Sequence, residues 1–416
     1  MELQTLNPKP ESNYIAIIGA GAAGIFAAIT CAENNPSAKV FVFEKSSKLL
    51  SKVKVSGGGR CNVTHACFDK NVLVQNYPRG ERELKSPFSK YYTLDIIKWF
   101  ETNGVKLKTE ADGRMFPVTD DSQTIIECLL HRAHELNINI KTNCGVSSIE
   151  KTENGFGINF LTGEKFICDK LIIATGGHPE LKGYNWIAEL GIKIISPVPS
   201  LFTFNIPDSP FKGLEGTAIQ ARVKINKTKL EQTGPVLITH WGLSGPAVLK
   251  LSAWGALLLK EMNYDFTITV NFLSEWDEEK LREHLLQIKS SSPTKKVSST
   301  KVEILTNRFW ERICNLSNIG VEVNWASVSK QQLNALIHNL LNHQLHVKGK
   351  TTFKEEFVTA GGVDLKEIDM QTMQSKKIPG LFFAGEVINV DGITGGFNFQ
   401  NAWTTGWIAG RHAASV

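Results

Sequence analysis

The chain has 416 residues, 42% of them apolar, and this length and composition predict a globular protein with a sizeable core and two or three domains. Its 46 Lys and Arg against 41 Asp and Glu give a formal net charge of +5, too mild to require a nucleic-acid partner. Seven cysteines, an odd number without framework spacing, fit a reducing compartment better than a secreted disulfide scaffold, so we expect a cytoplasmic protein.

Residues 14–32, YIAIIGAGAAGIFAAITCA, carry no charge over a length that could span a membrane. Gly19, Gly21 and Gly24 follow a β-branched run, which is typical of a strand that turns sharply into a helix. The stretch before them lacks the cationic start of a signal peptide. We therefore predict a strand, a turn and a helix here, and no membrane span.

The spacing of these glycines, G-x-G-x-x-G, is typical of a dinucleotide-binding turn. Gly19 would make the tight turn, Gly21 would admit a pyrophosphate, and Gly24 would let helix and strand pack closely. A second strand, residues 40–45, contains Glu44 twenty positions after Gly24, where an acidic residue binds a ribose diol. The alternative is a glycine turn in an α/β protein that binds no nucleotide.

Residues 52–65, KVKVSGGGRCNVTH, place three glycines directly before Arg60, Cys61 and Asn62. Glycines let a chain pass close to a cofactor, and a guanidinium and an amide supply donors to its anionic or carbonyl edges. Cys61 is then expected to pack beside the cofactor without redox activity, although a redox pair with Cys67 is an alternative. Cys61, His65 and Cys67 lack a fourth ligand at zinc-site spacing, so no metal site is predicted.

Two segments in the first half of the chain predict further strands beside a cofactor. Residues 137–150 predict a strand followed by a hairpin, and fold analogy suggests that Val146 lies near an adenine. Residues 168–180, CDKLIIATGGHPE, predict a strand that leads into the turn Thr175-Gly176-Gly177.

The middle of the chain predicts a group of strands followed by helices. Strand-like runs at 216–226 and 264–272 precede helical patterns that begin at Glu275 and Asn307, and residues 290–301 predict a solvated polar loop. His240, in the glycine-containing stretch THWGLSGPA, has an unperturbed pKa suited to a proton donor. A structural role for this histidine is the alternative, because the sequence shows no partner for it.

The end of the chain predicts a second cofactor motif. Residues 380–410 indicate a strand that ends at Glu386, a loop rich in glycine, and a helix that begins near 394–396. A nicotinamide enzyme has no need of a motif at each end of the chain, whereas FAD requires its ribityl and flavin ends to be held as well. The helix would point its N-terminal N–H groups at the flavin pyrimidine edge. The alternative is an apolar helix that simply docks on the sheet.

Five stretches taken in order, KVKVSGGGRCNVTH, LIIATGG, THWGLSGPAVL, TAGGV and GEVINVDGITGGFNFQNAWTTG, resemble the BaiN/RdsA family of NAD(P)/FAD-dependent oxidoreductases, which includes aminoacetone oxidase. The resemblance implies an α/β, Rossmann-like two-dinucleotide-binding-domain FAD fold with an inserted β-barrel-like and small helical domain. We expect a discontinuous FAD-binding domain at 1–196 and 351–416 and a substrate domain at 197–350. The motifs and the resemblance together assign these residues to FAD: Gly19, Ala20, Gly21, Ala23, Gly24, Glu44, Lys45, Arg60, Cys61, Asn62, Val146, Thr175, Gly176, Gly385, Glu386, Gly396, Asn398, Phe399 and Gln400.

Three residues depart from the family pattern. His65 stands where Asn is common, Asn389 where Asp is common, and Phe397 where Tyr often occurs. These departures speak against a mechanism that needs a hydroxyl at 397 or a carboxylate at 389.

The resemblance implies an FAD-dependent oxidoreductase that takes hydride from a transiently bound NAD(P)H and reduces an activated carbon–carbon double bond. The candidate substrates are a uridine of 23S rRNA, which becomes dihydrouridine, and a small conjugated enone. An RNA substrate would meet one of two basic patches, at 45–60 and at 346–354, unless these are ordinary solvated surface. Three alternatives stay open: an aminoacetone-type amine oxidase that uses O2, a flavin disulfide reductase, and a non-catalytic FAD-containing RNA-binding factor.

Overall fold

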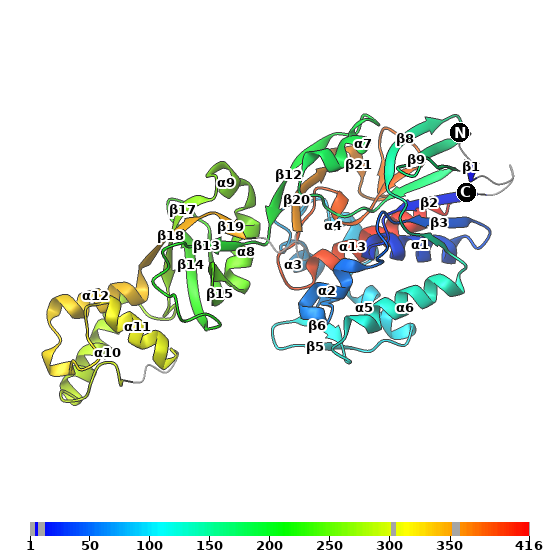
Figure 1. Ribbon diagram of the computed structural model, residues 1–416. Helices are drawn as coiled ribbons and strands as arrows, with labels where there is room; N and C mark the ends of the chain where they lie inside the picture. The colour runs from blue at the N-terminus through cyan, green and yellow to red at the C-terminus, as the bar shows by residue number, and fades with distance from the viewer. Residues whose placement is uncertain (1–4, 7–12, 301–304, 352–357, 416) are drawn as a thin grey trace. The chain divides into compact units, whose positions relative to one another are not determined.

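The structure, a computed structural model, describes residues 5–6, 13–300, 305–351 and 358–415. The chain divides into two units (Figure 1): unit 1 comprises residues 1–200 and 354–416, and unit 2 comprises residues 201–353. Unit 2 is therefore an insertion between two parts of unit 1. That the two units are separate domains with the boundaries expected from the sequence stays a prediction.

The core of unit 1 is a mostly parallel sheet of seven strands in the order β21-β22-β23-β11-β2-β3-β7. Its central strands have the sequences YIAII, KLII and LFF and are almost wholly buried, which is typical of parallel strands covered on both faces. The strands are β2 (Tyr14–Ile18), β3 (Lys39–Phe43), β7 (Asn139–Lys141), β11 (Lys170–Ile173), β21 (Ile368–Asp369), β22 (Gln374–Ser375) and β23 (Leu381–Phe383).

Two helices of unit 1, α1 (Ala22–Asn34) and α13 (Phe397–Ala413), pack against each other although they come from opposite ends of the chain (Figure 1). A Cβ atom added to Gly406 would lie 2.6 Å from the carbonyl oxygen of Ala23, and one added to Gly410 would overlap that of Ala27. Glycine is needed at both positions because the two helices approach so closely.

The other strands of unit 1 that the structure describes form three smaller sheets. The first contains β1 (Thr5–Leu6), β10 (Lys165–Cys168), β9 (Gly155–Phe160) and β8 (Val146–Thr152), the second β12 (Ile194–Ser200) and β20 (Val358–Val363), and the third β4 (Thr64–His65), β6 (Arg114–Pro117) and β5 (Leu107–Thr109). The other helices are α2 (Ser51–Gly59), α3 (Lys70–Val74), α4 (Lys85–Lys90), α5 (Thr93–Thr102), α6 (Ser122–Glu135) and α7 (Asn185–Ala188), with 3-10 turns η1 (Leu181–Tyr184), η3 (Leu365–Glu367) and η4 (Gly385–Val387).

Unit 2 contains one sheet in the order β18-β17-β14-β15-β16-β13-β19. β18 (His343–Lys348) and β19 (Lys350–Thr351) lie at opposite ends of this order, yet only Gly349 separates them in the chain. The segment 343–351 thus pairs with β17 on one side and β13 on the other, which closes the sheet into a barrel. Gly349 has φ +92°, a conformation that favours glycine at this bend. The remaining strands are β13 (Thr203–Asn205), β14 (Ala218–Ile225), β15 (Glu231–Thr239), β16 (Gly242–Ser244) and β17 (Asp265–Asn271).

The helices of unit 2 share a hydrophobic core with this barrel. They are α8 (Pro246–Trp254), α9 (Ala256–Glu261), α10 (Glu278–Ser291), α11 (Asn307–Leu316), the 3-10 turn η2 (Trp325–Ser327) and α12 (Lys330–Leu341). The expectation that residues 290–301 form a solvated loop was wrong in part. Val297 is fully buried, and its carbonyl oxygen accepts a 2.9 Å hydrogen bond from the Trp310 indole because the segment covers the core. Lys301, the last residue of that stretch, lies outside the described residues.

The predicted α/β fold with an inserted barrel and helical part is confirmed. The uncharged stretch 14–32 forms β2, the glycine turn and most of α1, as expected. Of the helices in the described part of the chain, none combines the length and apolar character that crossing a bilayer requires.

Candidate functional site

Four parallel strands of unit 1 end at the same level of their sheet. Ile18, the last residue of β2, pairs with Phe43 of β3 on one side and with Ile173 of β11 on the other. Ile173 pairs in turn with Phe383, the last residue of β23. The loops that follow these four strands therefore emerge at the same edge of the sheet. This is the edge formed by the carboxyl ends of the strands, where open α/β sheets bind ligands. All four segments carry residues that the sequence assigned to a cofactor: Gly19 to Gly24, Glu44 and Lys45, Thr175 and Gly176, and Gly385 and Glu386.

The turn after β2 has no room for side chains at two of its glycines. A Cβ atom at Gly19, where φ is +105°, would lie 2.5 Å from the carbonyl oxygen of Ala174, and one at Gly24 would overlap that of Gly19. A Cβ atom at Gly21, in contrast, would meet nothing within 4 Å. Gly21 is the N-cap of α1, so this open space adjoins the start of the helix, where the first N–H groups have no partner within the helix. Such a position suits an anionic ligand.

The side chain of Glu44 connects this turn to the end of β3. Its Oε2 accepts a 3.0 Å hydrogen bond from the Ala20 N–H, and its Oε1 accepts from the N–H and the hydroxyl of Ser46, both at 2.9 Å. The Cys144 N–H donates to the Glu44 carbonyl oxygen at 2.8 Å. This bond brings the start of β8, with Val146, to the same edge, although a contact of Val146 with a nucleotide stays a prediction.

Glu386 lies in η4, three residues after the end of β23, and its carboxylate is bound by two groups and closely packed against a third. Lys52 Nζ lies 2.6 Å from its Oε2, the Thr359 N–H donates to its Oε1 at 2.9 Å, and a Cβ added to Gly177 would lie 2.6 Å from Oε1. Among the described residues, the buried hydroxyl of Thr359 has no hydrogen-bond partner. The sequence assigned Lys52 to a basic surface, whereas the structure shows it in an ion pair at the edge of the sheet.

The glycine-rich end of α2 presents bare backbone. Ser56, Gly57 and Gly58 have non-helical dihedral angles, so the helix is interrupted there. Gly57 packs closely against Phe116, and a Cβ atom added to Gly57 would lie 2.8 Å from that ring. At Gly58 and Gly59, with φ +70° and +85°, an added Cβ would meet nothing within 4 Å. The backbone at these two residues is therefore accessible to a ligand, and its conformation favours glycine.

Asn62 and His65 fix the start of α13. With its amide turned so that both neighbours are satisfied, Asn62 accepts a hydrogen bond from the Gly396 N–H at 2.9 Å and donates one to the Thr64 carbonyl oxygen at 3.0 Å. His65 Nδ1 lies 3.0 Å from the Gly395 carbonyl oxygen, and its ring stacks on Phe397 with centroids 4.7 Å apart. The sequence KVKVSGGGRCNVTH thus contributes both bare backbone and a brace for the glycine turn before α13.

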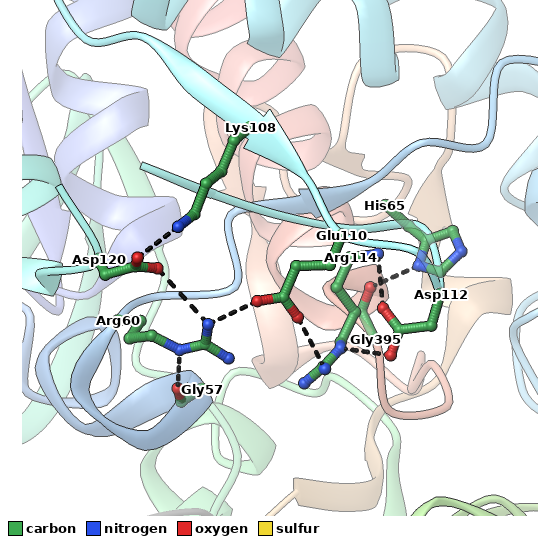
Figure 2. A network of polar contacts seen from close by, with 9 residues as sticks. All are labelled: Gly57, Arg60, His65, Lys108, Glu110, Asp112, Arg114, Asp120 and Gly395. Carbon is green, nitrogen blue, oxygen red and sulfur yellow. Dashed lines mark hydrogen bonds and ion pairs between the residues drawn. The ribbon is translucent and has the colours of Figure 1, made fainter. Parts of the chain in front are cut away.

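Arg60 lies in a network of ion pairs with the β5–β6 hairpin (Figure 2). Its Nη1 lies 2.6 Å from Glu110 and 3.5 Å from Asp120, and its guanidinium lies 4.0 Å from the centre of the Phe116 ring. The hydrogen bond that Arg60 donates to the Glu110 carboxylate raises the pKa of Arg60. Further ion pairs join Lys108 to Asp120 and Arg114 to Glu110 and Asp112. Arg60 therefore has partners within unit 1, and its predicted contact with a cofactor stays a prediction.

Cys61 has the environment of a packing residue. It is fully buried with φ +61°, and burial raises the pKa of its thiol to about 12. Burial likewise raises the pKa of Cys67, and all seven cysteines are free. A thiol with a raised pKa is a poor redox nucleophile at neutral pH, so this geometry does not favour a redox pair of Cys61 and Cys67.

The side chains after the start of α13 have internal partners. Gln400 is fully buried and accepts a 2.6 Å hydrogen bond from the Thr64 hydroxyl. The Asn398 amide bonds to both the N–H and the carbonyl oxygen of Gly392, at 2.8 and 2.9 Å. The contacts that the sequence assigned to Asn398, Phe399 and Gln400 with a cofactor stay predictions.

Sequence reasoning missed a buried ion pair at the loop before α13. Arg79 binds Asp391 through two nitrogens, with Nε 2.5 Å from Oδ1, and the Ser200 hydroxyl donates to Oδ2 at 2.7 Å. Asp391 is fully buried and the Arg79 side chain is 13% exposed. The residues lie 312 positions apart, so no local pattern could have paired them.

The segment 76–80 runs along this loop and holds it at several points. The Ile393 N–H donates to the Asn76 carbonyl oxygen at 2.9 Å, and the Tyr77 hydroxyl donates to the Phe397 carbonyl oxygen at 2.7 Å. Together with Asn62 and His65, this segment positions the glycine turn whose N–H groups start α13.

His240 lies in unit 2, in the turn between β15 and β16. Its side chain is 82% exposed, and its Nδ1 is 3.9 Å from Glu215. A role as proton donor therefore rests on the sequence alone and stays a prediction. In the described ranges, no three His, Cys, Asp or Glu side chains are grouped so as to hold a metal ion.

The model of the family described as "HI0933-like protein Rossmann domain" matches residues 13–412. A "Ribosomal RNA dihydrouridine synthase" of Escherichia coli K12 is 31% identical over 403 residues, which cover 94% of this chain and 95% of that protein. A "3-dehydro-bile acid delta(4,6)-reductase" of Clostridium scindens is 29% identical over 411 residues, which cover 97% of this chain and 99% of that protein.

Among solved structures, a 3-ketosteroid-delta4-(5alpha)-dehydrogenase from Rhodococcus jostii RHA1 matches the whole of both chains with a TM-score of 0.52 and 12% identity. A 3-ketosteroid delta1-dehydrogenase from Sterolibacterium denitrificans matches 97% of this chain and all of its own with a TM-score of 0.51 and 11% identity. At such low identity these likenesses establish a common fold and no more.

Proposed function

The chain belongs to the HI0933-like family, which its motifs predicted under the name BaiN/RdsA, and we propose that it is an FAD-dependent oxidoreductase that reduces an activated carbon–carbon double bond. The observation that carries this proposal is the convergence of four cofactor-type segments at one edge of the sheet of unit 1. The products or activities named for the two relatives, a dihydrouridine and a reduced bile acid, share the reduction of such a bond.

The residues at this edge fit FAD. Gly21, Gly58, Gly59 and Gly176 border open space at four points, as an extended ligand requires. The start of α1 would face the pyrophosphate and Glu44 the adenosine ribose. Glu386 would accept hydrogen bonds from the ribityl side.

When bound, FAD supplies hydride transfer at its flavin ring. The residues of this chain would position and stabilise that ring. The N–H groups at the start of α13 would face its pyrimidine edge, where negative charge collects on reduction. Asn62 and His65 keep these N–H groups in place through Gly395 and Gly396. We assign the supply of hydride to NAD(P)H, bound transiently because the sequence shows one nucleotide fingerprint.

An anaerobic half-reaction assay tests this proposal. The purified protein is expected to release FAD on denaturation and to lose its flavin absorbance when NADPH or NADH is added. Addition of a conjugated 3-oxo steroid, or of 23S rRNA from a strain that lacks the gene, should restore the absorbance and yield the saturated product. A protein that binds no FAD, or whose reduced flavin transfers no hydride to either substrate, would contradict the proposal.

The same assay, repeated with O2 admitted, separates two of the other candidates. Rapid reoxidation by O2 with consumption of aminoacetone would indicate an amine oxidase. Binding of RNA without any flavin reduction would indicate a non-catalytic RNA-binding factor.

A further inference from the structure

The charge of the chain is divided unevenly between its two units. Residues 201–353 contain 18 Lys and Arg against 13 Asp and Glu, whereas the rest of the chain contains 28 of each. The whole surplus of five positive charges therefore lies in unit 2. Within unit 2, residues 201–274 and 343–353, which include the barrel, hold nine cations against five anions, while residues 275–342 hold nine against eight.

Cations gather on the outer face of the barrel. On β14, Arg222 and Lys224 are exposed while Val223 between them is fully buried, because alternate residues of a strand face opposite sides. On β18, His346 and Lys348 are exposed in the same way. Two more lysines lie in the turn after β14. We call this set the barrel face: Arg222, Lys224, Lys227, Lys229, His346 and Lys348.

Strand pairing brings the two rows of the barrel face close together. β17 lies between β14 and β18, with Thr269 opposite Lys224 and Thr267 opposite His346. Neighbouring strands are about 4.8 Å apart, so the two rows of cations lie about 10 Å from each other. Long Lys and Arg side chains on such rows can reach the same polyanion.

The cations of the barrel face are largely available. Within the described part of the chain, no ion pair involves Arg222, Lys224 or Lys348, while His346 lies 3.2 Å from Asp265. Glu231 stands opposite Lys224 in the sheet, so the face contains two acidic residues among five Lys and Arg. No exposed large apolar side chain among the described residues lies on β14, β17 or β18. Surfaces that bind membranes commonly combine cations with exposed apolar side chains, so this face suits a soluble polyanion better.

Two of the five cations in the first basic patch expected from the sequence have partners within unit 1, while Lys45, Lys48 and Lys54 are exposed. Lys52 pairs with Glu386, and Arg60 pairs with Glu110 and Asp120. These two cations hold unit 1 together at the candidate site. In the second patch, Lys350 packs 4.9 Å from the Tyr264 ring and burial lowers its pKa, and Lys354 lies outside the described residues.

We propose that the barrel face docks the phosphate backbone of an RNA substrate. Clustered exposed cations neutralise phosphates, and release of counterions then drives binding. Arg222, Lys224 and Lys348 suit this role because no ion pair among the described residues involves them, although Glu231 and Asp265 lie opposite Lys224 and Lys348 in the sheet. The inference rests on the proposed function, since it names RNA as the substrate class of the same enzyme. It assigns RNA contact to Arg222 and Lys224 and no part in the chemistry to either residue.

A paired charge-reversal experiment tests the barrel face. The variant R222E/K224E is compared with K98E/K106E, which reverses two exposed cations of unit 1 that have no ion pair among the described residues and changes the total charge equally. Affinity for transcribed 23S rRNA is measured at several salt concentrations. We expect R222E/K224E to bind at least about tenfold more weakly, with a slope of log affinity against log salt reduced by about two, and K98E/K106E to bind like the wild type.

Flavin content and reduction by NAD(P)H are measured in all three proteins. These measurements distinguish a failure of the RNA-docking proposal from a failure of the proposed oxidoreductase activity. Equal RNA affinity in the three proteins, or no binding of the wild type, overturns the role of the barrel face. An equal loss in both variants overturns it as well, because it indicates a general charge effect. Loss of flavin reduction in the wild type would instead overturn the proposed oxidoreductase activity and leave the RNA measurement standing.

Discussion

Lys52 and Glu386 lie 334 positions apart in the chain, and their side chains form an ion pair of 2.6 Å. This pair joins α2 to η4, so the two segments that flank the candidate site are tied together. Removal of the cation in Lys52→Met should leave the Glu386 carboxylate, which is 16% exposed, with one partner fewer.

We expect Lys52→Met to weaken FAD binding by roughly three- to tenfold. The effect should be smaller than the about 1.5–3 kcal/mol of a buried charged hydrogen bond, because Lys52 is 45% exposed and solvent screens it. Titration of apoprotein with FAD, followed by flavin fluorescence, measures the change. Lys54→Met, on the same helix, is the control. Equal affinities of the two variants would contradict a role for the ion pair.

Gly21→Ala tests whether a ligand occupies the space above the first glycine turn. Gly21 has φ −84°, which any residue adopts, and an added Cβ meets no protein atom within 4 Å. The stability of the apoprotein should therefore hardly change, whereas FAD affinity should fall at least about tenfold if a pyrophosphate approaches this backbone. Gly320→Ala, whose Cβ would have 3.9 Å of clearance in unit 2, is the control. Unchanged FAD affinity in Gly21→Ala would place the cofactor elsewhere.

Arg79→Met should destabilise unit 1 by about 3–5 kcal/mol, because it leaves the buried Asp391 carboxylate without its cation. Burial already raises the pKa of Asp391 against the opposing pull of Arg79. Urea unfolding of the full chain measures the loss. The double variant Arg79→Met/Asp391→Leu should recover much of the stability, since no buried charge remains. Equal instability of the single and double variants would show that the loss comes from packing and not from the unpaired charge.

The stability of unit 2 should fall as the solution is acidified. Burial lowers the pKa of His343 to about 4, and its ring lies 5.2 Å from that of Phe211. Because the folded-state pKa lies below the unfolded value of about 6.5, the stabilisation is present above pH 6.5 and is lost as the pH falls toward 4.

We expect this histidine to account for a loss of about 2 kcal/mol between pH 7 and pH 5. Unfolding in urea, followed through the buried tryptophans Trp310 and Trp325, measures it. His343→Leu should show a correspondingly smaller difference between the two pH values, whereas the exposed His346→Leu should behave like the wild type. The same difference in all three proteins would assign the effect to other groups.

Cys67→Ser should leave flavin reduction and turnover intact. Cys61, the only partner that the sequence suggested for it, is fully buried with its thiol pKa raised to about 12. Stopped-flow reduction by NAD(P)H and steady-state turnover are the measurements. Loss of both activities would favour a flavin disulfide reductase instead.

Local patterns predicted the parts of the fold that depend on short-range physics. The turn at Gly19 and the close packing at Gly24 follow from glycine spacing after a buried strand. The apolar run that forms β23 also predicted a strand, although the sequence placed its end at Glu386 and the strand ends at Phe383. Parallel strands then align their carboxyl ends, so the sequence could also predict which loops meet.

The sequence could not predict contacts between residues that are far apart in the chain. Nothing near Asp391 indicates that Arg79 will neutralise it, since a charged residue in a loop is usually exposed. The burial of Val297 was missed for the same reason, because its partner Trp310 belongs to a later helix. Both errors arise where tertiary contacts bury a stretch whose composition is that of solvated surface.

The strands on either side of each junction between the units form matched pairs. In unit 1, β12 pairs with β20, with Ser200 opposite Val358, and in unit 2, β13 pairs with β19, with Thr203 opposite Thr351. The first and last strands of the inserted residues 201–353 thus pair with each other. The two strands of unit 1 that flank the insertion pair with each other as well. We therefore expect that residues 201–353 can be replaced as one piece while the register of β12 on β20 stays unchanged.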